Sequence, residues 1–151
     1  MNTKNLLKLA DFLETEITDE QFDIRSFRRN KDGKAELFYT NNECGSIGCA
    51  LGWTPFVEGL EVTEDDFYFS TPSLNFHKYS NRVFGDLDKF VGDYVDDLFY
   101  KSDLDGEELE SLDIYSLWDF IFSSGWFSIE GQGTRLATSN RIRIACEGLI
   151  R

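Results

Sequence analysis

The block from Cys44 to Trp53 constrains the fold of this chain more than any other ten residues. It reads C-G-S-I-G-C-A-L-G-W, with two cysteines and three glycines in a short apolar stretch. The block is too apolar for an ordinary loop and too rich in glycine for an ordinary helix. Gly48 and Gly52 are four residues apart, so on a helix they would share one face and let another element approach closely. We therefore expect a short helix from Ile47, packed inside the core.

Composition indicates one globular domain over residues 1–151. Of these residues, 41% are hydrophobic and 15% are aromatic, which is enough to bury a single core. The first residues do not form an apolar leader, and no stretch reaches the roughly 18 apolar residues that a membrane span needs. The three cysteines, an odd number, then predict reduced thiols. These features together favour a cytoplasmic protein.

Helical periodicity recurs along the chain. Apolar residues spaced three and four apart predict helices over 3–15, 79–84, 114–122 and a C-terminal stretch from Thr134 or Ser139. The last of these would turn four residues inward and four outward: Ile142, Ala145, Cys146 and Leu149 against Arg135, Arg141, Arg143 and Arg151. Segments 24–29 and 35–40 favour a small antiparallel hairpin. The expected fold class is mainly α, with α+β as the alternative: a single compact helical domain with at most that hairpin.

The core of this domain is expected to form where the cysteine block, the tryptophan-rich segment and the C-terminal helix meet. Large apolar side chains from these three regions are the ones that a single core of this size would bury. The residues to which we assign a structural role are Leu51, Trp53, Phe84, Trp118, Phe122, Ile142 and Leu149.

Residues 86–113 concentrate negative charge. They contain 11 acidic residues and 2 lysines, a net charge of −9 within a chain whose formal net charge is −13. Apolar residues recur at positions 90, 94 and 98, so the segment is expected to fold as a helix rather than trail as an acidic tail. Carboxylates aligned on a folded scaffold can imitate the phosphates of DNA and occupy a basic groove. The candidate partner-binding residues are Asp93, Asp96, Asp97, Asp103, Asp105, Glu107, Glu108 and Glu110.

Four blocks occur in an order that resembles a known family. They read L-x-K-L-A-D-F-L at 6–13, C-G-S-I-G-C-A-L-G-W at 44–53, Y-S-N-R-V-F-G at 79–85, and L-W-D-F-I-F-S-S-G-W at 117–126 leading into N-R-I-R at 140–143. The chain resembles a family of small uncharacterised proteins encoded by tailed phages and prophages. Two departures matter. The family often has histidine where this chain has Trp53, which weakens a catalytic or metal role there, and 86–113 looks like an insertion.

The resemblance implies a bacteriophage origin and brings no activity with it. Combined with the charge, it favours an acidic accessory protein in the host cytoplasm that binds and modulates or inhibits a host protein. The expected partner is basic, such as a nuclease or another nucleic-acid-binding protein of host defence, which would make the chain an anti-restriction or anti-CRISPR protein that mimics DNA. Its own negative charge would repel nucleic acid and anionic membranes, so neither is an expected partner.

A pocket around the cysteine block is the alternative site, in a small ligand- or metal-binding module or an enzyme. A zinc site would need every cysteine and the one histidine of the chain, and only one pair of these is close in sequence. A cysteine nucleophile needs a base, and that histidine is the one candidate. We therefore expect no metal, cofactor or catalytic residue, and regard a virion structural protein as a third alternative. The candidate pocket residues are Cys44, Cys49, Trp53, His77 and Arg82.

Overall fold

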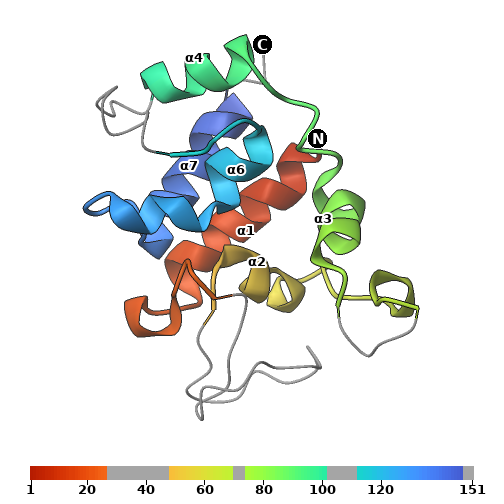
Figure 1. Ribbon diagram of the computed structural model, residues 1–151. Coiled ribbons are helices and arrows are strands. Elements are labelled where there is room, and N and C mark those ends of the chain that lie inside the picture. Colours follow the sequence, from red (N-terminus) through yellow and green to blue (C-terminus); the bar gives the residue numbers. More distant parts are fainter. Residues whose placement is uncertain (27–47, 70–73, 102–111, 148–151) are drawn as a thin grey trace.

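The computed structural model describes residues 1–26, 48–69, 74–101 and 112–147 (Figure 1). The described chain is mainly helical, as the sequence predicts, and contains isolated β-bridges in place of a sheet. The predicted hairpin over 24–29 and 35–40 lies largely outside the described residues. The helices are α1 (Thr3–Thr15), α2 (Ala50–Trp53), α3 (Phe76–Phe84), α4 (Asp93–Lys101), α6 (Leu117–Phe122) and α7 (Arg135–Glu147), and the 3-10 turns are η1 (Asp19–Gln21), η2 (Thr54–Phe56), η3 (Glu64–Asp66) and η4 (Ser124–Ser128).

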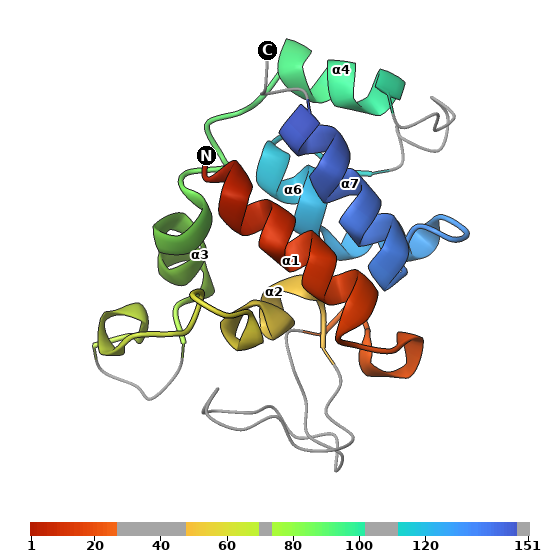
Figure 2. The same ribbon diagram turned by 180° about the vertical axis from the view of Figure 1, so that it is seen from behind.

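The first and last helices form the centre of the molecule. Helices α1 and α7 lie side by side in both views and run antiparallel (Figures 1 and 2). They approach closely at small residues, where the Ser139 hydroxyl donates to the Ala10 carbonyl at 3.2 Å. At the other end of the contact, Arg135 donates to the carbonyls of Leu13 and Glu14 at 2.8 and 2.9 Å, and so satisfies the C-terminal end of α1.

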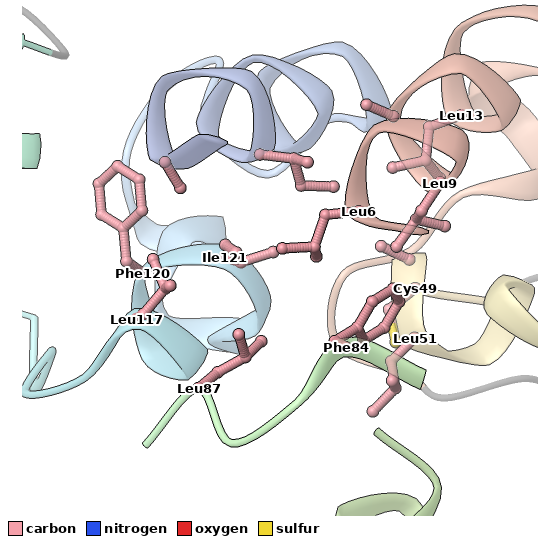
Figure 3. Packing of buried hydrophobic residues seen from close by; sticks show 14 of the residues in the cluster. Leu6, Leu9, Leu13, Cys49, Leu51, Phe84, Leu87, Leu117, Phe120 and Ile121 are labelled. Atoms are coloured by element: carbon pink, nitrogen blue, oxygen red, sulfur yellow. The ribbon is translucent and has the colours of Figure 1, made fainter. Parts of the chain in front are cut away.

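The core lies between this helix pair and the shorter helices. Leucines of α1 point toward α6 and toward the end of α3, where Leu6, Leu9 and Phe84 meet (Figure 3). Leu51, Trp53, Phe84 and Ile142 are buried as predicted, and Leu149 lies outside the described residues. Trp118 and Phe122 are only half-buried, so their assignment to the core is right only in part.

Arg141 corrects the prediction for the C-terminal helix. It was expected to point outward, yet it is fully buried and its guanidinium lies 4.4 Å from the ring centroid of Trp126. Position 141 shares a helix face with the buried Thr138 and Ala145, three residues before and four after it. The side chain donates to the Gln132 carbonyl at 2.9 Å and to the Thr138 hydroxyl at 3.0 Å. Burial lowers the pKa of Arg141 to about 9, which still leaves it protonated at neutral pH.

The cysteine block also differs from its prediction. The helix begins at Ala50, not at Ile47, because Gly48 and Cys49 are extended and pair with an earlier segment. The Gly48 amide donates to the Gln21 carbonyl at 3.0 Å, and the Cys49 amide donates to the Ser26 carbonyl at 2.6 Å. Gly48 and Gly52 therefore share no helix face. This pairing connects residues more than 20 positions apart, which local periodicity does not report.

Candidate functional site

Helix α4 is the described helix of the acidic segment, and it lies across the ends of α6 and α7 (Figure 1). Leu98 is fully buried and anchors the helix. Asp96 and Tyr100 are four residues apart and occupy the side of α4 opposite to Leu98, where Tyr100 is 86% exposed. The spacing of apolar residues at 90, 94 and 98 predicts a helix that reaches back to position 90, but α4 begins only at Asp93. Gly92 has a left-handed backbone (φ 66°), and Val91 lies outside the helix.

A second stretch of chain completes this surface. Val91 and Ser116 form an antiparallel bridge, and the Leu117 amide donates to the Phe90 carbonyl at 2.9 Å. This pairing places Ser116 beside Val91, just before α4. Tyr115 is 70% exposed there, and its hydroxyl donates to Asp113 at 3.2 Å. We name the exposed acidic and apolar residues of this region the acidic face: Asp88, Asp96, Asp97, Asp113, Val91, Tyr100 and Tyr115.

The predicted partner-binding residues divide into three groups. Asp96 and Asp97 are exposed on α4, as expected. Asp93 is the first residue of α4, and its side chain is not described. The remaining five lie outside the described residues: Asp103, Asp105, Glu107, Glu108 and Glu110.

Five residues of the acidic face were not among the predicted partner-binding residues: Asp88, Val91, Tyr100, Asp113 and Tyr115. Asp88 and Asp113 fall at the two ends of the acidic segment, and the negative charge of that segment was a signal for both. Tyr115 lies just beyond the segment and reaches the face only through the bridge between residues 91 and 116. No local pattern in the sequence indicates that bridge.

Lys89 and Lys101 lie within the acidic segment, but the ion pairs of the described arginines lie elsewhere. Within the described ranges, no arginine forms an ion pair with an acid of the acidic face, and neither Asp96 nor Asp113 has a cationic nitrogen within 4 Å. Lys101 pairs with Asp97 at 2.8 Å along α4. The arginine pairs are Arg25 with Asp23, Arg82 with Asp66, Arg135 with Asp19, and Arg143 with Asp11 and Glu14.

The inner edge of the acidic face is fixed by hydrogen bonds. The Ser116 hydroxyl lies 3.3 Å from Asp88 and 3.0 Å from Asp119, and Ser116 and Asp119 form the capping box that begins α6. The His77 ring lies 3.7 Å from Asp88 and contacts the edge of Trp118, with a distance of 6.5 Å between ring centroids. These contacts attach the acidic face to the helical core.

The alternative pocket is only partly assembled. A hollow of about 300 Å³ is lined by Cys49, but Trp53 is buried in the core, where its indole nitrogen donates to the Gln21 carbonyl at 3.0 Å. His77 contacts Asp88, and Arg82 is paired with Asp66 at 2.7 Å. Cys44 lies outside the described residues. Of the five candidates, the structure thus places one in the hollow.

The two described thiols, those of Cys49 and Cys146, are poorly suited to nucleophilic chemistry. Burial raises the pKa of Cys49 to about 11 and that of Cys146 to about 11. Both thiols therefore stay protonated at neutral pH, and the thiolate is the nucleophilic form. The part of the chain that the structure describes contains no group of three or more histidine, cysteine, aspartate or glutamate residues placed to hold a metal ion.

Comparison with known proteins adds no family to this picture. Neither protein-family models, nor curated proteins, nor solved structures match this chain. Among the described helices, none combines the length and the apolar character that crossing a bilayer requires.

Proposed function

We propose that this chain is a non-catalytic accessory protein of phage origin that binds a basic surface of a host protein and inhibits or modulates it. The observation that carries the proposal is that Asp96 and Asp113, two exposed carboxylates of the acidic face, have no cationic partner among the described residues. The arginines of α7 are engaged with α1 or buried against Trp126, so they do not neutralise Asp96 and Asp113. A partner that binds nucleic acid offers the complementary surface, because its groove is built to receive phosphates.

The exposed rings of the acidic face suit the same partner. Tyr100 and Tyr115 present flat apolar surfaces beside carboxylates, and tyrosine is enriched at protein interfaces. Arginine or lysine side chains of a basic groove can pair with the carboxylates and stack over the rings. Charge would guide the encounter, and the rings would add contact area once the partner is bound. A host nuclease or other nucleic-acid-handling defence protein is the class of partner that fits.

Capture from bacterial lysate tests this proposal when matched variants are compared. The face variant carries Asp96→Asn and Asp113→Asn. The control variant carries Glu58→Gln and Glu130→Gln, which removes the same charge from exposed positions outside the acidic face. We expect the wild type and the control to retain a basic, nucleic-acid-handling protein at about 0.05 M salt and to lose it at about 0.5 M, where screening is strong. The face variant should retain about tenfold less at low salt.

Competition with nucleic acid makes the test specific. Short duplex DNA added to the lysate should displace the captured protein, because both would occupy the same groove, while the chain alone should not bind that DNA. Equal capture by the face variant and the control, or capture that duplex DNA leaves unchanged, would contradict the proposal.

A further inference from the structure

A second surface, around Arg25, has the opposite character to the acidic face. Arg25 borders three adjoining hollows of about 300, 420 and 260 Å³. The first has an apolar floor formed by the buried Ile24 and Leu51 and the half-buried Trp118 and Phe122. The rings of Trp118 and Phe122 contact each other with a centroid distance of 4.8 Å. The uncharged thiol of Cys49 completes the wall, so the floor excludes charged groups.

The same hollow also has polar lining residues: Arg25, Ser26, Ser123 and Ser124. Ser124 is exposed, while Ser123 accepts a hydrogen bond from the Gly125 amide at 3.1 Å and keeps its own proton for donation. A guanidinium beside hydroxyl groups is a set of donors, and donors that converge on one point recognise an anion.

Arg25 is held in place before any ligand arrives. Its Nε and one Nη donate to the two carboxylate oxygens of Asp23 at 3.0 and 3.3 Å, and its guanidinium lies 4.0 Å from the ring centroid of Phe127. These two bonds engage two of the five N–H donors of the guanidinium, and the other three have no partner among the described residues. The side chain is 55% exposed, so those donors are accessible. A preorganised arginine loses little entropy when it binds.

We propose that the hollow between Arg25 and Trp118 binds a small amphipathic anion, with a flat apolar body and one carboxylate or sulfonate group. The apolar body lies on Trp118 and Phe122, and the anionic group accepts from Arg25 and the serine hydroxyls. The volume suits a ligand of about two fused rings, at the small end of ligand pockets. A single negative charge is specified because the chain as a whole carries −13 and would repel a polyanion. This site is independent of the acidic face.

Two matched dyes test the proposal. 1-Anilinonaphthalene-8-sulfonate carries a flat apolar body and one sulfonate, and N-phenyl-1-naphthylamine is the same body without the charge. Trp53 and Trp126 are fully buried, so Trp118 is the tryptophan whose emission a dye in this hollow should quench most. We expect saturable 1:1 binding of the sulfonate dye. Arg25→Gln should weaken that dye about tenfold and change the affinity of the uncharged dye less than about twofold.

Control variants separate the site from nonspecific binding. Lys4→Gln removes one positive charge at an exposed position away from the hollow and should leave both affinities unchanged. Ser124→Leu narrows the hollow from an exposed position and should weaken both dyes, with circular dichroism confirming that each variant is folded. Binding that does not saturate, equal effects of Arg25→Gln and Lys4→Gln on the sulfonate dye, or no effect of Ser124→Leu on either dye would overturn the proposal.

Discussion

The acidic face and the hollow between Arg25 and Trp118, called the Arg25 pocket below, use charge in opposite ways. On the acidic face, Asp96 and Asp113 are exposed and have no cationic partner among the described residues. In the pocket, Arg25 is fixed from two sides by Asp23 and Phe127. Every described arginine is held in a comparable way, by a carboxylate or, for Arg141, by a ring. Among the described residues, the arginines serve to fix the structure, and the carboxylates of Asp96 and Asp113 are left at the surface without a cationic partner.

Replacing the buried Arg141 should have the largest effect on the free energy of unfolding. Arg141→Ala would lose the contact with Trp126, leave a cavity and remove the donor to the Gln132 carbonyl. We therefore expect the free energy of unfolding to fall by about 3 kcal/mol. Arg143→Ala, two residues along the same helix, removes two partly exposed ion pairs, with Asp11 and Glu14, and should cost about 1 kcal/mol. Urea unfolding of both variants measures the difference, and equal losses would show that Arg141 is not structural.

Breaking the ion pair between Asp66 and Arg82 should have the second largest effect on the free energy of unfolding. Asp66→Asn keeps the shape but removes the charge that accepts from Arg82 at 2.7 and 2.9 Å, and the Asp66 side chain is only 1% exposed. We expect a loss of about 2 kcal/mol in the free energy of unfolding. Asp19→Asn, at a carboxylate that is 74% exposed, is the matched control and should have little effect. A loss from Asp19→Asn as large as that from Asp66→Asn would contradict the account.

The same pair predicts a dependence of stability on pH. Burial by itself raises the pKa of Asp66, but hydrogen bonds from Arg82 and Thr63 outweigh it and hold that pKa below its usual value. A carboxyl whose pKa is lower in the folded state stabilises the protein above its unfolded pKa, near 3.9, and this contribution is lost as the pH falls through the folded value. Urea unfolding midpoints should therefore fall steeply below about pH 4 in the wild type. They should fall less steeply in Asp66→Asn, and parallel profiles would contradict the assignment.

Removing the unpaired negative charge should have the smallest effect on stability, and of the opposite sign. The variant with Asp96→Asn and Asp113→Asn loses carboxylates that repel the surrounding acids, so its thermal midpoint should rise by about 1–2 °C at low salt. The rise should vanish at high salt, where the repulsion is screened. A fall in the midpoint at low salt would show that these carboxylates are engaged in the fold, which would remove the basis of the proposed function.

Much of the fold could be predicted from the sequence because it rests on local periodicity. The spacing of apolar residues predicts α1 and most of α3 and α7, and Gly85 ends α3 as expected, with a left-handed backbone (φ 81°). Long-range pairing could not be predicted in this way. The extended start of the cysteine block depends on residues 21–26, and the place of Tyr115 on the acidic face depends on the bridge between residues 91 and 116.

Charge patterns were informative about the surface and misleading about the core. The negative segment led to Asp96 and Asp97, because solvated carboxylates remain where the sequence concentrates them. The same expectation placed Arg141 outside, although the helical positions of its buried neighbours already indicated the inward face. The Arg25 pocket had a weaker signal, since its walls come from residues 24–26, 49–51 and 118–124, which only the fold brings together.

The proposed binding of a basic partner depends on Asp96 and Asp113, which have no cationic partner among the described residues. The most direct measurement is the dissociation constant for the purified captured protein as a function of salt, for the wild type, the Asp96→Asn and Asp113→Asn variant, and the Glu58→Gln and Glu130→Gln control. We expect a steep loss of affinity with salt for the wild type and the control. The face variant should bind more weakly, and its affinity should depend less on salt. Identical salt dependence in all three proteins would contradict the proposal.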